Sequence, residues 1–229
     1  MDVSDALERM RGGLVVSVQA APGSPLAAPK QLAAIARAVD AGGAAAIRTE
    51  GLAAVAAIRE AVDVPVIGLV KRRVPESDVY ITPNLEDALA VTEAGADLVA
   101  VDATERLRAE GTSGPEFVAA LAGKLPGMVV ADVDCASAGR AAAGAGAVAV
   151  ATTLSGSAGP PDVGLVAELA AELDAPVLAE GRYATAAQVR AAFEAGAFAV
   201  VVGTAITDPT ALTRALAAAT PGGADDRAG

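Results

Sequence analysis

One lysine is well suited to chemistry because of its place at the end of a short apolar run. The stretch from Val64 to Arg73 reads V-P-V-I-G-L-V-K-R-R, so Lys71 follows apolar residues and precedes Arg72. An amine there can form a Schiff base, bind a phosphate or act as a general base. Base chemistry near neutral pH requires that burial and neighbouring cations lower its pKa from about 10.4. Lys71 is therefore the first candidate for a catalytic group.

Other polar or special residues end further apolar runs along the chain. In a closed parallel barrel these ends meet at one rim, where catalytic groups collect. A carboxylate such as Glu180, within hydrogen-bond reach of Lys71, would share and pass a proton with it. The chain has no His, which excludes His-based proton relays and His-ligated metal centres. The residues at the ends of the runs are Gln19, Arg48, Lys71, Asp102, Asp132, Thr152 with Thr153, Glu180 and Gly203.

An internal repeat predicts the elements that position these residues. Ala-Gly phrases precede apolar runs at Gly43, Gly95, Gly146 and Gly196, at intervals of 52, 51 and 50 residues. Each phrase indicates the end of a helix and the start of a strand. A second series of strand starts lies between them, which gives eight strand–helix units of about 25 residues. We therefore predict a single (β/α)₈ TIM barrel, with an open doubly wound sheet as the alternative.

The two ends of the chain extend this prediction. Residues 2–11 have helical spacing of apolar residues and are followed by two glycines, which predicts an extra helix before the first strand. Residues 1–219 are expected to form the barrel domain. Residues 220–229 are polar and rich in Gly, so we expect a disordered tail.

Composition restricts the possible partners. The 229 residues carry a formal net charge of −11, which disfavours binding to nucleic acid or to an anionic membrane. The single cysteine, Cys135, allows no internal disulfide and fits a reducing cytoplasm. No apolar run reaches the roughly 20 residues of a membrane span. We expect a soluble cytoplasmic protein that acts on a small molecule.

Two glycine-containing loops predict a phosphate site. Gly181 follows the seventh expected strand and Gly203, with Thr204, follows the eighth. The loops after these two strands commonly bind phosphate in such barrels, because backbone N–H groups approach the ligand closely there. Gly181, Gly203 and Thr204 are therefore assigned to phosphate binding.

The ordered set of motifs resembles the N-acylglucosamine-6-phosphate 2-epimerase family, also called N-acetylmannosamine-6-phosphate 2-epimerase. The resemblance extends from about residue 12 to residue 214. No single motif is specific, but eight in the same order are. The matching stretches are residues 13–20, 46–48, 67–72, 79–83, 101–104, 131–133, 152–156 and 179–182.

The resemblance implies a cofactor-independent and metal-free interconversion of N-acetylmannosamine 6-phosphate and N-acetylglucosamine 6-phosphate in sialic-acid or amino-sugar catabolism. The family's catalytic Lys matches Lys71, and the Glu paired with it matches Glu180. Its substrate-binding Arg and Asp match Arg48 and Asp132. A homodimer is expected from the resemblance and from the Ala-rich residues 210–219. Gln19, Thr153 and Arg182 complete the expected substrate-binding set.

Two departures from the family pattern add negative charge. Asp208 stands where the family often has Arg, and Thr49-Glu50 follows Arg48 where the family usually has Ala-Asn. Asp208 precedes Pro209, so we expect it to cap the last helix. These departures keep open a phosphosugar-binding barrel without turnover. A lyase in which Lys71 forms a Schiff base is the other alternative.

Overall fold

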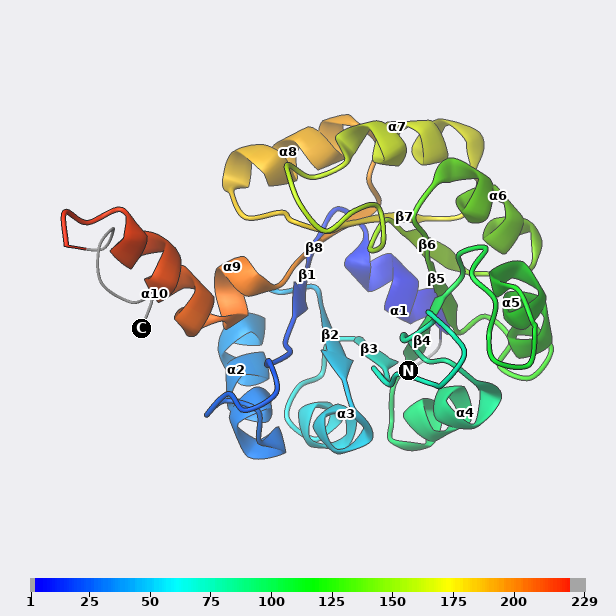
Figure 1. Cartoon of the computed structure of the whole chain (residues 1–229), viewed down its shortest axis with the longest axis horizontal. Coiled ribbons are helices and arrows are strands. Elements are labelled where there is room, and N and C mark those ends of the chain that lie inside the picture. Colours follow the sequence, from blue (N-terminus) through cyan, green and yellow to red (C-terminus); the bar gives the residue numbers. More distant parts are fainter. Residues whose placement is uncertain (1–2, 223–229) are drawn as a thin grey trace.

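The computed structural model describes residues 3–222, and its centre is a closed barrel of parallel strands (Figure 1). Neighbouring strands pair in chain order, and pairing of Val15 with Val201 joins the first strand to the last. This closure confirms the predicted (β/α)₈ barrel and excludes the open sheet. The strands are β1 (Leu14–Ser17), β2 (Ala46–Glu50), β3 (Val66–Leu69), β4 (Leu98–Asp102), β5 (Val129–Asp132), β6 (Ala149–Ala151), β7 (Val177–Glu180) and β8 (Ala199–Val202).

Helices surround the barrel and connect its strands, and two further helices, α9 and α10, follow the last strand. They are α2 (Pro29–Ala41), α3 (Leu52–Arg59), α4 (Leu85–Glu93), α5 (Gly114–Ala122), α6 (Ala136–Gly144), α7 (Val163–Glu172), α8 (Ala186–Glu194), the short α9 (Thr204–Thr207) and α10 (Pro209–Ala218). The glycines that predicted helix ends have positive φ angles, +94° at Gly43, +101° at Gly95, +101° at Gly146 and +94° at Gly196. The repeat therefore marked real changes from helix to strand.

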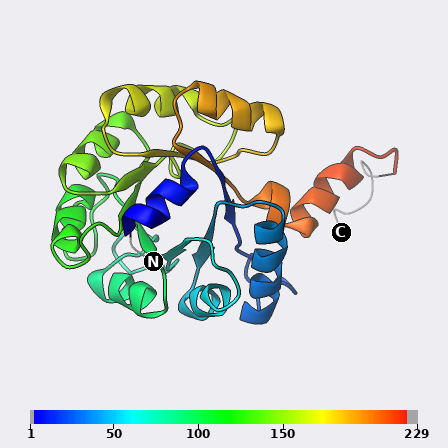
Figure 2. The same ribbon diagram turned by 180° about the vertical axis from the view of Figure 1, so that it is seen from behind.

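The predicted extra helix is α1 (Val3–Met10), which lies across the amino-terminal end of the barrel (Figure 2). Its Met10 is fully buried and packs with the side chains that fill the barrel interior. The backbone N–H of Gly12 donates to the carbonyl of Phe198, immediately before β8. The amino-terminal end is thus closed, and the opposite end is free to form a site.

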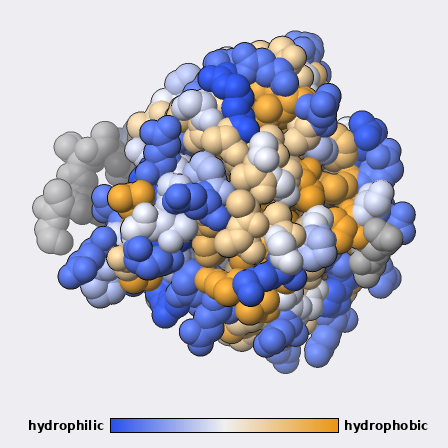
Figure 3. All heavy atoms as spheres, turned by 90° about the vertical axis from the view of Figure 1, so that its right-hand side faces the viewer, coloured by the Kyte–Doolittle hydropathy of each residue, from blue (hydrophilic) through white to orange (hydrophobic). Residues whose placement is uncertain are grey.

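The strands are apolar on both faces because one face fills the barrel and the other packs on helices. Val, Leu, Ile and Ala supply most of both buried clusters. Gly68 in β3 shows how close this packing is: an added Cβ would lie 2.6 Å from Val91 and 2.9 Å from Ala96. Figure 3 shows polar side chains mixed with hydrophobic ones on the outer side that bears α5.

Three details differ from the sequence predictions. Strand β2 continues through Arg48 to Glu50, although the charge of Arg48 had predicted an earlier end. Buried carboxylates pair with this guanidinium, which allows it to stay inside a strand. The short α9 was not predicted, and α10 points away from the barrel (Figure 1). From residue 223 onward, the expected tail lies outside the described residues.

Candidate active site

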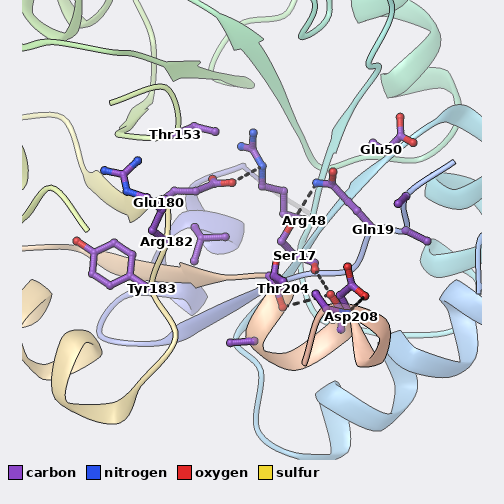
Figure 4. A pocket seen from close by; sticks show the side chains of 18 of the residues that line it. Ser17, Gln19, Arg48, Glu50, Thr153, Glu180, Arg182, Tyr183, Thr204 and Asp208 are labelled. Carbon is purple, nitrogen blue, oxygen red and sulfur yellow. Dashed lines mark hydrogen bonds and ion pairs between the residues drawn. The ribbon is translucent and has the colours of Figure 1, made fainter. Parts of the chain in front are cut away.

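A cavity of about 830 Å³ opens at the carboxyl ends of the strands. Its lining includes Arg48 from β2, Glu180 from β7 and Lys71 from the segment after β3. Figure 4 shows Arg48 and Glu180 pointing toward one another, with Gln19 and Ser17 nearby. Gln19, Thr153, Gly181, Arg182, Gly203 and Thr204 also line the cavity, so every predicted site residue except Asp132 borders it directly.

Lys71 reaches into this cavity from the loop that follows β3. Its Nζ donates a 2.5 Å hydrogen bond to Oε1 of Gln19. Burial of the amine and the nearby positive charge of Arg48 lower the pKa of Lys71, although Glu50 and the other carboxylates act in the opposite direction. The side chain keeps access to solvent through the mouth. Lys71 therefore meets the electrostatic requirement for a general base.

Arg48 is the centre of a buried ionic network. The residue is 1% exposed, and its Nη2 donates to Oδ2 of Asp132 at 2.7 Å. Its Nε lies 3.2 Å from Oε1 of Glu180. Burial opposes the charge of Arg48, but the two carboxylates outweigh this effect and its pKa is raised. Asp132 is itself fully buried and also accepts a 2.7 Å hydrogen bond from the hydroxyl of Thr153, so it fixes the side chain of a residue that lines the cavity.

Glu180 differs from its expected role in one respect. We expected it to pair with Lys71, but its carboxylate pairs with Arg48 and makes no ion pair with Lys71. The guanidinium of Arg48 is buried beside the end of β7, whereas Lys71 enters the cavity from the loop after β3 and remains exposed. Burial raises the pKa of Glu180, against the lowering effect of Arg48. Glu180 can therefore hold a proton more readily than an exposed carboxylate.

Two buried atoms of this network lack protein partners. Within residues 3–222, neither Nη1 of Arg48 nor Oε2 of Glu180 makes a hydrogen bond. Buried polar atoms without partners cost free energy, and such atoms in a cavity are available to a ligand. The site thus offers one donor and one acceptor beside the Lys71 amine.

The loops after β7 and β8 form the other side of the cavity. Gly181 has a φ of +113°, and Gly203 lies so close to β1 that an added Cβ would be 3.2 Å from Cβ of Ser17. The hydroxyl of Thr207 donates to the Ser17 carbonyl at 3.0 Å and fixes α9 against β1. The N–H groups of Thr204 and Ala205 precede the first hydrogen bonds of α9. Backbone donors are thus present where we predicted phosphate binding.

Two charged residues at this rim have protein partners. Arg182, with a φ of 65°, donates through Nε to the Pro160 carbonyl at 3.0 Å and through Nη1 to the carbonyl of Gly156. Its charge therefore fastens the loop between β6 and α7. Asp208 accepts a 2.9 Å hydrogen bond from the N–H of Ala211, which confirms the predicted cap of α10.

Two more positions complete the comparison with the sequence. Asp102, expected at the rim, is fully buried and accepts hydrogen bonds from the N–H and hydroxyl of Thr104, so it does not line the cavity. Tyr80 does line it. Tyr80 lies within the matching stretch 79–83, but the sequence gives it no predicted role because no apolar run ends there. Among residues 3–222, no group of three or more His, Cys, Asp or Glu side chains is arranged to hold a metal ion.

The fold and the cavity together define a (β/α)₈-barrel enzyme whose site combines an amine, a guanidinium and two carboxylates. A sequence profile described as "Putative N-acetylmannosamine-6-phosphate epimerase" matches residues 32–221. The chain therefore belongs to the N-acetylmannosamine-6-phosphate epimerase family. This confirms the resemblance that the motifs indicated.

Individual relatives agree with this assignment. A Cutibacterium acnes protein named "Putative N-acetylmannosamine-6-phosphate 2-epimerase" is 47% identical over 212 residues, which cover 89% of this chain and 92% of the relative. A relative of the same name from Caldanaerobacter subterraneus is 42% identical over 217 residues, 92% of each chain. The solved N-acetylmannosamine-6-phosphate 2-epimerase from Clostridium perfringens superimposes with a TM-score of 0.86 at 33% identity, covering 92% of this chain and 94% of that one.

Proposed function

We propose that this enzyme interconverts N-acetylmannosamine 6-phosphate and N-acetylglucosamine 6-phosphate by moving a proton at C2. The observation that carries the proposal is the Lys71 amine, with its lowered pKa, beside the buried pair of Arg48 and Glu180 in one cavity. The names of the relatives give N-acetylmannosamine 6-phosphate as their substrate.

The chemistry follows from the open-chain form of the sugar. Its C1 carbonyl acidifies the neighbouring C2–H, so a positioned amine can remove this proton and leave an enolate, with the negative charge on the C1 oxygen and the acylamino group still on C2. Return of a proton to the opposite face of C2 inverts that carbon. Lys71 is the proposed base, and Arg48 with Asp132 orients and polarises the sugar. The proton returns either from Lys71 or from Glu180, whose raised pKa and open Oε2 suit a proton donor.

The phosphate is proposed to lie against the loops of Gly181 and Gly203. The donors there are the backbone N–H groups around Thr204, and the guanidinium of Arg182 lies at the same rim. Gln19 and Thr153 border the sugar side of the cavity. The net charge of −11 makes local backbone donors important, because the protein as a whole does not attract an anion.

The decisive experiment is incubation with either phosphosugar in D₂O, followed by NMR at C2. Incorporation of deuterium together with formation of the other epimer supports the proposal. Binding without exchange would instead identify a phosphosugar-binding barrel. A covalent adduct trapped by borohydride would identify a Schiff-base lyase. The proposed reaction uses no metal, so activity should survive EDTA, and a loss that magnesium restores would contradict it.

We further propose that the enzyme is a homodimer in which α10 packs on a second copy. None of the ten residues of α10 is buried, and Leu216 is 72% exposed. Figures 1 and 2 show α10 leaving the barrel between α8 and α2 instead of packing on the strands. A helix of this length is marginal in water without tertiary packing. The Ala211, Leu212 and Ala215 side chains also border the mouth cavity, so the partner would lie at the edge of the site.

The proposed location is the cytoplasm, where a phosphorylated sugar is retained and a single cysteine stays reduced. Within residues 3–222, no helix has the length and apolar character needed to cross a lipid bilayer.

A further inference from the structure

Tyr80 is held next to the catalytic lysine by backbone hydrogen bonds. The chain turns back after β3, and Ile81 forms an antiparallel bridge with Lys71. The N–H of Arg72 donates to the Tyr80 carbonyl at 2.9 Å, and the N–H of Thr82 donates to that of Val70 at 2.7 Å. Any displacement of Tyr80 therefore also displaces Lys71.

The returning segment is itself fixed to the barrel. Thr82 is fully buried and has a φ of 44°, which is uncommon for a β-branched residue. Its hydroxyl donates to the Ala100 carbonyl in β4 at 2.6 Å and accepts from the N–H of Val70 at 3.3 Å. Strain of this kind persists only where surrounding contacts enforce it. The position of Tyr80 is therefore preorganised.

The Tyr80 ring packs on the cluster that fills the barrel interior, while the residue lines the mouth cavity and is half-buried. Its hydroxyl makes no hydrogen bond to another described residue. The nearby carboxylate of Asp132 is occupied by Arg48 and Thr153. A phenol that lines a cavity, packs its ring on the apolar cluster and has no hydrogen-bond partner for its hydroxyl among the described residues is suited to hold a polar ligand.

The electrostatic surroundings keep this hydroxyl protonated. Burial, followed by the negative charges of Asp132 and Asp102, raises the pKa of Tyr80, although Arg106 and Arg48 oppose the effect. The side chain is thus a neutral hydrogen-bond donor throughout the working range of a lysine base.

We propose that Tyr80 is a further substrate-binding residue, whose hydroxyl donates to an oxygen of the sugar and holds the open chain beneath the Lys71 amine. This inference rests on the proposed function. It concerns the sugar end of the ligand, so it makes a prediction that differs from any effect on phosphate binding.

The kinetic test compares Tyr80→Phe with Thr92→Val. The hydroxyl of Thr92 donates to the Leu89 carbonyl within α4 at 2.7 Å, and Thr92 does not line the cavity, so its removal is the control. Loss of a hydrogen bond to the reacting sugar predicts a kcat/KM for Tyr80→Phe lower by about tenfold or more, at an unchanged melting temperature. Thr92→Val should keep the wild-type kcat/KM.

The binding test uses the Lys71→Ala background, in which no turnover interferes. Calorimetry of Lys71→Ala/Tyr80→Phe against Lys71→Ala should show about tenfold weaker binding of N-acetylglucosamine 6-phosphate and unchanged binding of inorganic phosphate. Equal affinities for the sugar phosphate would overturn the inference. A lower melting temperature with unchanged kinetics would also overturn it, because Tyr80 would then serve the fold and not the substrate. Failure of the wild type to exchange C2 would refute the epimerase function alone, since the binding comparison still tests Tyr80.

Discussion

Nε of Arg48 lies 3.2 Å from Oε1 of Glu180, and the two side chains are only 1% and 12% exposed. Glu180 is therefore first a counterion of Arg48, together with Asp132. The amine of Lys71 contacts the neutral amide of Gln19 instead. Because no carboxylate pairs directly with the ammonium form, burial and Arg48 can keep the pKa of Lys71 low. Lys71 and Glu180 thus have different partners, so the amine can accept a proton while the buried carboxyl can carry another.

Replacement of Lys71 by Ala should nearly abolish epimerisation while phosphosugar binding survives. The amine is proposed to act on the reacting carbon, whereas the loops of Gly181 and Gly203 are proposed to hold the phosphate. We expect turnover to fall by about 10²–10⁴-fold, the usual contribution of a general base. Rate and affinity are measured by coupled NMR turnover and calorimetry. Near-normal turnover would show that another group removes the proton.

The pH dependence of kcat/KM should follow the deprotonation of the Lys71 amine. Activity must rise with pH, with a midpoint below the ordinary Lys value of 10.5, because burial and Arg48 lower the pKa of Lys71. Glu50 raises this pKa, so Glu50→Gln should move the midpoint to lower pH. Glu60→Gln, at the end of α3 far from the mouth, is the control and should leave it unchanged. An unshifted midpoint in Glu50→Gln would argue that Lys71 is not the titrating base.

Glu180→Gln should lower turnover by about 10²–10⁴-fold, because the amide preserves shape but cannot carry a proton. A loss below about threefold would leave Glu180 only the role of counterion to Arg48. A proton-inventory or single-turnover measurement in D₂O would then show whether Lys71 alone serves both faces of C2.

The same variant should change the pH dependence of stability. Burial raises the pKa of Glu180 above its ordinary 4.5, so the folded protein retains a proton that the unfolded chain loses. This stabilisation is complete below that ordinary value and is lost as pH rises through the folded pKa. Urea unfolding from about pH 5 to about pH 8 should therefore give a flatter curve for Glu180→Gln than for the wild type. Parallel curves would mean that Glu180 titrates normally.

Asp208 should behave as a helix cap. Asp208→Asn keeps the acceptor for the Ala211 N–H and should be nearly silent. Asp208→Arg removes the acceptor and should destabilise α10 by about 1 kcal/mol without improving the Michaelis constant. Circular dichroism melts and steady-state kinetics test both variants. Since Asp208 also borders the cavity, a several-fold lower Michaelis constant for Arg at unchanged stability would show that the position faces the substrate.

The proposed dimer depends on the apolar face of α10. Leu216→Asp should convert the dimer to a monomer, as measured by size-exclusion chromatography with light scattering. Leu107 is also exposed, at 57%, but lies in the loop after β4, so Leu107→Asp is the matched control and should remain dimeric. A monomeric wild type would refute the interface.

The fold could be predicted because glycines and apolar runs act locally. A glycine that ends a helix does so wherever the helix lies, and eight repeats leave few architectures. The meeting of Lys71, Arg48, Asp132 and Glu180 followed from the rule that parallel strands end at one rim.

The partners within the site could not be predicted in the same way. Whether Glu180 meets Lys71 or Arg48 depends on how far each side chain lies from the barrel axis, and sequence order does not contain this depth. Arg182 turned to the loop carbonyls of Gly156 and Pro160, which no strand-end rule anticipates. Tyr80 escaped notice because it lies on a returning segment and not at the end of an apolar run.

The close packing at Gly68 restricts which residue can occupy this position, and through it the geometry of the candidate active site. One added methyl group would lie 2.6 Å from Val91 and 3.1 Å from Val55, so the strand would have to shift toward the barrel axis. Lys71 follows only three residues later and would move with it. Mutational surveys should therefore find Gly68 as intolerant of substitution as Lys71, even though Gly68 is buried away from the cavity. An engineer who wishes to alter the substrate range should leave β3 untouched and vary the loops after β7 and β8.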